Sequence, residues 1–270
     1  MAVWKPKANG LAGRSDVQSA SSARSGNEAA FYPRHAMKRR SMLVGSALAG
    51  VGAVLGGFPR AGEAAQPALY VFLHSLLEAR ALSRLFEAAL PGVEVWVLTK
   101  SRDFSRVRTR DPDAVVALAP VLVANGFTPA LQGYKGGQAS EPYVLVSTQS
   151  VTPKSVKSVG AVDILGRKEM GAFVASLLGG NEPQVEPVTK LADLLGLLQL
   201  GKVDAIVLPA RHASPLISRT RLSLKVSRLE GKGVGLPAFY PSSAEGQRMK
   251  GVFADLPSAL LQEMGVDSWR

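Results

Sequence analysis

Short apolar runs alternate with amphipathic segments over most of the chain. The apolar runs have the length and the β-branched content of buried strands, and the segments between them place apolar residues three or four positions apart, as helices do. We expect strands at residues 68–73, 93–98, 113–118, 141–147, 159–165, 185–188, 203–208, 222–226 and 233–238. We expect helices at residues 76–90, 166–178, 190–200 and 243–264, and a short helix before the turn Asn125-Gly126. Strands that alternate with helices of this length predict βαβ units and parallel sheets.

The segment before this pattern, residues 37–65, has the features of an export signal. A Lys-Arg-Arg cluster at residues 38–40 precedes an apolar stretch at 42–58 that is rich in Gly and Ala, and small residues follow it up to Ala65. This order is typical of a cleaved signal, and residues 39–43 (RRSML) resemble a twin-arginine motif. We therefore expect export to the periplasm with cleavage near Ala65, and a retained membrane anchor is the alternative.

Composition and charge narrow this picture further. Residues 1–36 show no apolar periodicity, and we interpret them as an extension ahead of the true start or as a disordered leader. Residues 66–270 hold 23 Lys or Arg and 18 Asp or Glu, and this net charge of +5, spread along the chain, does not predict nucleic-acid binding. The absence of cysteine excludes disulfides, thiolate zinc sites and thiol nucleophiles. No apolar run after residue 65 reaches the length of a membrane span.

The order of motifs in the second half resembles the type 2 periplasmic-binding-protein fold. Strand residues 142–147 (PYVLVS) are followed by 159–163 (VGAVD), by a helix start at 166–168 (GRK), by the strand 185–188 and by 200–205 (LGKVDA). Within that fold the chain is similar to small solute-binding-like proteins related to the phosphate and phosphonate binders of ABC transporters. The resemblance covers residues 143–209 well, and the short chain departs from full-sized transport receptors, which implies a trimmed first lobe.

The resemblance implies an α/β fold of two lobes, with mainly parallel sheets and flanking helices. Lobe 1 would span residues 66–146 and lobe 2 residues 147–236. Residues 237–270 would return to lobe 1 and end in a helix. Closure of the lobes would then bend two crossing strands, near Ser147 and near residues 236–240.

Polar residues follow several expected strands, and ligands of open α/β sheets bind beyond the carboxyl ends of the strands. Ser, Thr and Arg side chains beside the N–H groups of a helix start can form a site for an anion. The candidate ligand-binding residues are Ser75, Ser101, Arg102, Ser147, Thr148, Gly166, Arg167, Lys168 and Arg211. Two simpler interpretations stay open: Ser75 and Glu78 can form a capping box, and Arg167 and Lys168 can be solvated surface charges.

The sequence offers little for catalysis. It has no His and carboxylate cluster at metal-ligand spacing, no Gly-x-Ser-x-Gly elbow and no phosphate-loop signature. We interpret the Gly-rich residues 133–137 as a loop rather than a phosphate cradle, and His74 and His212 as polar residues without a joint role.

We therefore expect an exported, monomeric solute-binding-like protein without enzyme activity, cofactor or metal. It would hold a small phosphate- or phosphonate-like anion between its lobes and serve an ABC-transporter permease or a membrane sensor, with no nucleic-acid partner. Two alternatives remain. One is a ligand-free periplasmic accessory or interaction protein on the same fold, and the other is an enzyme on that fold, which would need a strongly perturbed acid or base in its cleft.

Overall fold

The computed structural model describes residues 66–270, apart from the side chains of residues 230–232. The expected leader and export signal, residues 1–65, lie outside the described residues. In the described part, no helix combines the length and the apolar character needed to cross a membrane.

The elements follow the alternation expected from the hydrophobic pattern. The strands are β1 (Ala68–Phe72), β2 (Glu94–Val97), β3 (Ala114–Leu118), β4 (Leu131–Tyr134), β5 (Ser140–Ser147), β6 (Ser158–Val162), β7 (Gln184–Val188), β8 (Ala205–Pro209), β9 (Lys225–Gly235), β10 (Pro237–Pro241) and β11 (Ser268–Trp269). The helices are α1 (Ala79–Ala89), α2 (Ser101–Phe104), α3 (Ala119–Ala124), α4 (Arg167–Leu177), α5 (Asp193–Gln199), α6 (Ala210–Ile217), α7 (Ala244–Val252) and α8 (Ser258–Met264), with 3-10 turns η1 (Val107–Arg110) and η2 (Phe253–Asp255).

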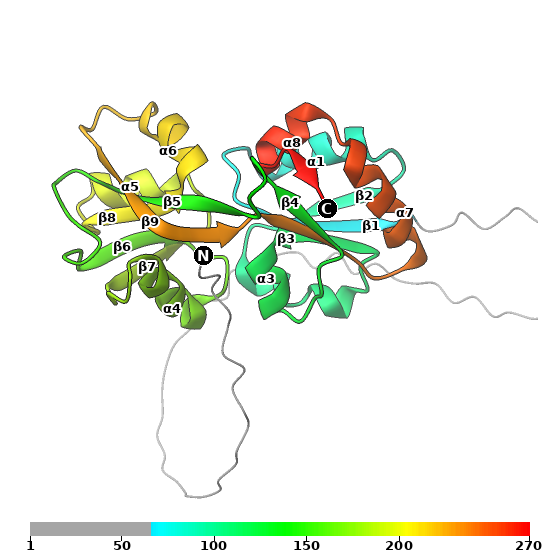
Figure 1. Ribbon diagram of the computed structural model, residues 1–270, viewed down its shortest axis with the longest axis horizontal. Coiled ribbons are helices and arrows are strands. Elements are labelled where there is room, and N and C mark those ends of the chain that lie inside the picture. The colour runs from blue at the N-terminus through cyan, green and yellow to red at the C-terminus, as the bar shows by residue number, and fades with distance from the viewer. Residues whose placement is uncertain (1–65) are drawn as a thin grey trace, which may run out of the picture. The chain divides into compact units, whose positions relative to one another are not determined.

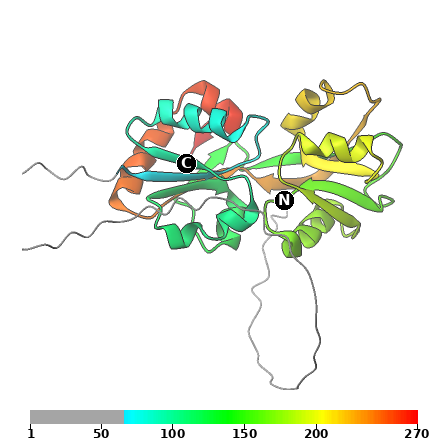
Figure 2. The same cartoon turned by 180° about the vertical axis from the view of Figure 1, so that it is seen from behind.

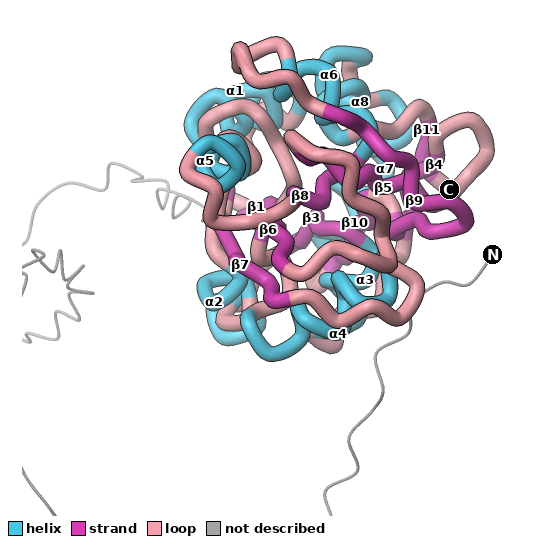
Figure 3. Tube along the Cα trace, turned by 90° about the vertical axis from the view of Figure 1, so that its left-hand side faces the viewer, coloured by secondary structure: helices cyan, strands magenta, loops and turns pink. Residues whose placement is uncertain are grey.

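These strands form two sheets, and each sheet is the centre of one lobe (Figure 1 and, from behind, Figure 2). The first sheet has the order β11-β4-β10-β3-β1-β2 and the second β7-β6-β8-β5-β9. Viewed along the long axis, α1, α5, α6 and α8 lie on one side of the strands and α2, α3 and α4 on the other (Figure 3).

The sheets are mixed, so the expectation of mainly parallel sheets is wrong. Parallel pairing joins β1 to β2 and β3, and β6 to β7 and β8, whereas the remaining strand pairs of the described part are antiparallel. The reason is that the chain passes between the lobes in strands rather than in helices. The outgoing β5 and the returning β9 pair with each other, and β10 then re-enters the first sheet against the direction of β3.

The passage between the lobes lies earlier in β5 than expected. Ser140 pairs with Gly235 and Ser147 with Lys225, so the second sheet begins at Ser140 rather than at residue 147. A register shift between Pro142 and Val144 interrupts this ladder near the passage. Because β5 runs antiparallel to β8, its last residue, Ser147, lies beside the start of β8 and not beside its carboxyl end.

Alternation along β1 shows how one strand supplies two cores. Leu69 and Val71 are buried in a cluster on one face of the first sheet, and Tyr70 and Phe72 belong to a second cluster on the other face, because successive side chains of a strand point to opposite faces. The second cluster continues into the other lobe, where it includes Phe173. The two lobes therefore share one continuous apolar core.

Helix α1 starts later than the apolar pattern predicts. The hydroxyl oxygen of Ser75 accepts a hydrogen bond from the N–H of Leu77 at 2.8 Å, and this turn delays the helix to Ala79. Glu78 occupies the N-cap position without a side-chain cap bond. The alternative interpretation of Ser75 and Glu78 as a capping box is therefore wrong.

The helix expected at residues 243–264 is broken into α7, η2 and α8. Ser243 caps the first part, since its hydroxyl accepts from the N–H of Gly246 at 3.1 Å. Pro257 breaks the run, because the residue before a proline is pushed out of helical geometry, and Leu256 is extended, with φ −61° and ψ 144°.

Candidate functional site

Two adjoining hollows lie between the lobes, lined by the loops that follow β1 and β2 in the first lobe and β6 and β7 in the second. The larger, here called the outer groove, has a volume of about 570 Å³ and is lined by residues 100–102, 105, 125, 163–167 and 187–189. The smaller, here called the inner cavity, has a volume of about 60 Å³ and is lined by residues 72–79, 82, 97–99, 162, 164 and 189–192. Both therefore lie beyond the carboxyl ends of parallel strands, where α/β sheets bind ligands.

Cationic side chains reach the outer groove from both lobes. Lys100 and Arg102 stand at the start of α2 in the first lobe, and Arg167 opens α4 in the second. Within the described residues, neither Lys100 nor Arg167 has an ion-pair partner, and the Nε of Arg102 lies 4.0 Å from the Oδ1 of Asp103. These positive charges are therefore largely uncompensated by the protein itself.

Asp163 is the one carboxylate among the described residues that line the outer groove, and both of its oxygens are engaged. Oδ2 accepts a hydrogen bond from the hydroxyl of Ser101 at 2.9 Å, and Oδ1 accepts one from the N–H of Gly166 at 2.7 Å. The first bond joins the two lobes, and the second holds the start of α4. Gly166 has φ +89°, a conformation that glycine adopts at low cost. The groove thus presents three cations against one occupied acid, which favours a negatively charged ligand.

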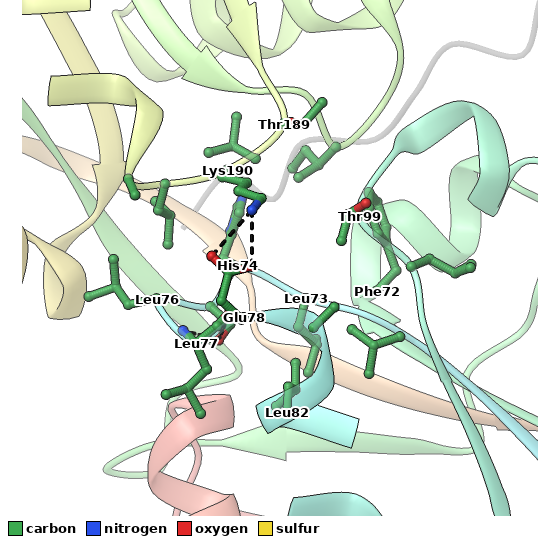
Figure 4. A pocket seen from close by; sticks show the side chains of 18 residues that line it. Phe72, Leu73, His74, Leu76, Leu77, Glu78, Leu82, Thr99, Thr189 and Lys190 are labelled. Atoms are coloured by element: carbon green, nitrogen blue, oxygen red, sulfur yellow. Dashed lines mark hydrogen bonds and ion pairs between the residues drawn. The ribbon is translucent and has the colours of Figure 1, made fainter. Parts of the chain in front are cut away.

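The inner cavity is apolar and is bordered by an ion pair between the lobes (Figure 4). The Nζ of Lys190 donates to both oxygens of Glu78, at 3.0 and 3.2 Å, and this hydrogen bond raises the pKa of the lysine. Most of the lining is aliphatic, for example Leu73, Leu82 and Ile164. Unlike the outer groove, this cavity holds no uncompensated charge.

Five polar side chains gather at the passage between the lobes, and all are buried except the partly buried Arg211. We call them the joint cluster: His74, Glu141, Tyr143, Arg211 and His212. Arg211 donates through Nη1 to the Oε2 of Glu141 and through Nε to the Nε2 of His212, the latter at 3.0 Å. The hydroxyl of Tyr143 lies 3.4 Å from the Nδ1 of His74, and His212 also hydrogen-bonds the backbone of His74. His74 and His212 therefore meet, contrary to the interpretation that they have no joint role.

The joint cluster has shifted ionisation. Burial, assisted by the charge of Arg211, lowers the pKa of both His74 and His212 to about 3, so both rings are neutral at neutral pH. Burial raises the pKa of Glu141, and the charge of Arg211 opposes that shift. Arg211 also lies against the end of α8, because a Cβ at Gly265 would be 2.3 Å from its Nη1. Partial negative charge at a helix carboxyl end suits a cation at that position.

The structure brings four of the nine predicted site residues together. Ser101, Arg102, Gly166 and Arg167 line the outer groove. Ser75 lines the inner cavity instead, and its hydroxyl is committed to Glu263 at 2.6 Å.

The other four predicted site residues lie apart from both hollows. Ser147 is buried at the far end of β5, where it donates to the carbonyl of Gln149 at 2.6 Å, and Thr148 follows it. They were placed near the cleft on the assumption that β5 is parallel to its neighbours. Lys168 is exposed on α4 without lining the groove, and Arg211 belongs to the joint cluster.

Sequence reasoning missed several residues that line the hollows. Lys100 and Thr189 each follow a strand, so the same rule of carboxyl ends that selected Ser101 also points to them. The inter-lobe ion pair of Glu78 with Lys190 carried no local signal, because its members are 112 positions apart. The burial of Glu141 and Arg211 could not be predicted either, since charged residues are rarely buried unless they are paired and this pair is distant in the sequence.

The remaining chemical motifs form no further site. Gly133 and Tyr134 belong to β4, and the rest of the Gly-rich segment is a turn whose Gly136 N–H donates to the Oδ2 of Asp267 at 2.6 Å. Over residues 66–270, no group of three His, Asp or Glu side chains is arranged to hold a metal ion.

No protein-family model and no curated protein matches the chain. Solved structures do match it. Tv2483 bound to L-arginine is 10% identical with a TM-score of 0.53, over 76% of this chain and 93% of that one. The periplasmic VFT2 domain of Bordetella pertussis BvgS is 11% identical with a TM-score of 0.50, over 74% and 92%. The P235GK mutant of ArgBP from T. maritima is 16% identical with a TM-score of 0.50, over 73% and 94%.

At these identities the likeness is one of fold. The described residues have the two-lobed α/β fold of periplasmic binding proteins, which confirms the predicted two-lobed architecture.

Proposed function

We propose that this protein is an exported solute-binding protein that holds a small anion, such as a phosphate or phosphonate, in the outer groove. The observation that carries the proposal is the convergence of Lys100, Arg102 and Arg167 on one groove whose only described carboxylate is already engaged. An anion there would meet opposite charge from both lobes, and binding would draw the lobes together.

The local backbone supports the same polarity of ligand. Helix α4 begins at Arg167, and the first N–H groups of a helix have no partner within it. These groups and the helix dipole favour a negative charge at this end of α4. Thr189 adds a hydroxyl group that can donate to a ligand oxygen, whereas the hydroxyls of Ser101 and Ser105 already donate to Asp163 and to the carbonyl of Arg102.

The biological setting of the proposal follows from the sequence. The protein would act as a monomer in the periplasm after removal of its signal near Ala65, and it would present the solute to an ABC-transporter permease or to a membrane sensor. The proposal contains no chemical step and no cofactor.

Calorimetric titration of the full chain with inorganic phosphate, sulfate and methylphosphonate tests this function, with L-arginine as the cationic comparison. Arg167→Gln should weaken the best anion about tenfold, which corresponds to the loss of one charge-assisted hydrogen bond. Lys168→Gln is the matched control, since Lys168 is the adjacent exposed cation that does not line the groove. The proposal fails if no anion binds, or if both variants weaken binding equally.

A second candidate is a ligand-free accessory protein, and one observation favours it. The lobes are already joined without solute, by Glu78 with Lys190, by Ser101 with Asp163 and by the shared apolar core. Small-angle scattering and thermal unfolding, each with and without saturating phosphate, separate the two functions. A solute-binding protein changes its radius of gyration or its melting temperature, whereas an accessory protein changes neither.

A further inference from the structure

The inner cavity is suited to hydrocarbon rather than to charge. Its walls come from both lobes and are mainly apolar, with Phe72, Leu82 and Leu98 from the first and Ile164 from the second. Its one lysine, Lys190, is neutralised by Glu78. A cavity with these walls stabilises an apolar group, at a gain of about fourfold in affinity for each methylene that leaves water.

The polar groups at the cavity wall do not change this conclusion. The hydroxyl of Ser75 already donates to Glu263 and accepts from Leu77. The ring of His74 lies beside the hydroxyl of Tyr143 and is neutral at neutral pH because burial lowers its pKa. Neither residue therefore offers a charge to a ligand.

The inner cavity adjoins the outer groove. Ile164 and Thr189 line both hollows, and the chain runs from the cavity wall at Thr99 directly to the groove wall at Lys100. A small molecule can therefore place one end among the groove cations and the other among the aliphatic side chains of the cavity.

We propose that the ligand is an anion on a short, unbranched aliphatic chain, with its charged head in the outer groove and its chain in the inner cavity. This inference rests on the proposed function and specifies its ligand class. The cavity volume of about 60 Å³ limits the aliphatic chain to a few carbon atoms, since a cavity needs about 10–15 Å³ of such volume to hold one water molecule. The head can be a carboxylate, sulfonate or phosphonate, because all three present oxygens to the same cations.

Calorimetric titration of the full-length protein with n-alkanoates from acetate to octanoate tests whether the inner cavity binds the aliphatic chain of the ligand. Affinity should rise about fourfold per methylene over the first members and then level off as the cavity fills. Butanesulfonate and butylphosphonate, compared with butanoate, rank the heads on one constant chain. Equal affinity along the whole series would overturn the inference while leaving the anion-binding function intact, and absence of binding by every anion would overturn both.

Variants with a larger side chain in the cavity wall test whether the aliphatic chain of the ligand lies in the inner cavity. Ala79→Leu on α1 narrows the cavity and should abolish the dependence on chain length while acetate binds as before. Ala81→Leu, on an exposed position of the same helix outside the cavity, should preserve the dependence. Ala192→Leu narrows the cavity from the second lobe and repeats the test if Ala79→Leu does not fold. A chain-length dependence that survives both filling variants would place the chain elsewhere and refute the assignment.

Discussion

The outer groove and the joint cluster both gather arginine near carboxylate, yet the two regions handle charge in opposite ways. In the groove, Arg167 is exposed and has no ion-pair partner among the described residues. In the joint cluster, the side chains of Arg211 and Glu141 are only 12% and 6% exposed and are paired with each other. The difference teaches where to look for a ligand. Buried charges that satisfy one another hold the structure, whereas accessible charges without partners are free to bind a solute.

The largest effect on stability is expected when the pair of Arg211 and Glu141 is separated. Arg211→Met leaves the carboxylate of Glu141 buried without its partner, and we expect a loss of about 3–5 kcal/mol in the free energy of unfolding. Urea denaturation measures this loss. Glu245→Gln, which removes the exposed pair with Arg248 on α7, is the control and should cost less than about 1 kcal/mol. Similar losses for the two variants would mean that burial does not increase the contribution of the Arg211–Glu141 pair to stability.

Gly265 tests the contact between the joint cluster and α8. Its φ is +73°, and a Cβ would lie 2.3 Å from Arg211, so Gly265→Ala combines backbone strain with a clash. We expect a loss of about 2–4 kcal/mol in the free energy of unfolding. Gly251→Ala in α7 is the control, because a Cβ there meets no atom and alanine favours helix, so this variant should be neutral or stabilising. Thermal unfolding of both proteins decides the point.

Acid should weaken the joint cluster. The pKa of both His74 and His212 falls from 6.5 in the unfolded chain to about 3 in the folded one, so the unfolded state binds more protons between these values. Stability should therefore decrease as the pH falls from about 6.5 towards about 3, with a slope approaching 1.4 kcal/mol per pH unit for each ring.

Variants isolate the imidazole contribution to this slope. Glu141 contributes to the pH dependence of stability with the opposite sign, because its raised carboxyl pKa makes the folded state bind the extra proton. Glu141 is present in the wild type and in both variants, so its contribution cancels in the comparison. His74→Gln and His212→Gln should each flatten the dependence of the unfolding free energy on pH by one ring's share. An unchanged slope in both variants would show that the rings are protonated without loss of stability.

The groove should show the smallest effect on stability. Lys100→Gln combined with Arg167→Gln removes two exposed charges that hold no other part of the protein, and the free energy of unfolding should change by less than about 0.5 kcal/mol. Denaturation and anion titration on the same sample sharpen the contrast, because affinity should fall while stability stays constant. A large loss of stability would show that these cations have structural partners.

Much of the fold could be predicted from the sequence because its signals are local. Apolar runs located most strands, and the Gly166 helix start and the turn at Asn125-Gly126 stand where expected. The strands expected at residues 222–226 and 233–238 are instead the long β9 (Lys225–Gly235) and β10 (Pro237–Pro241). Breaks within helices and short strands were harder to predict. The expected long C-terminal helix ignored the effect of Pro257 on its neighbour, and strand β4 and the edge strand β11 beside it are short and carry little pattern.

The sequence alone determined the alternating α/β pattern and the polar residues that follow strands at Ser101, Arg102, Gly166 and Arg167. Both follow from residue spacing within one segment. Tertiary structure alone decided the rest, because it depends on strand direction and on contacts between distant residues. Because β5 is antiparallel to β8, Ser147 and Thr148 lie at the end of the second sheet that is away from the two hollows. Burial converts Arg211 from a candidate ligand contact into the partner of Glu141, 70 positions away.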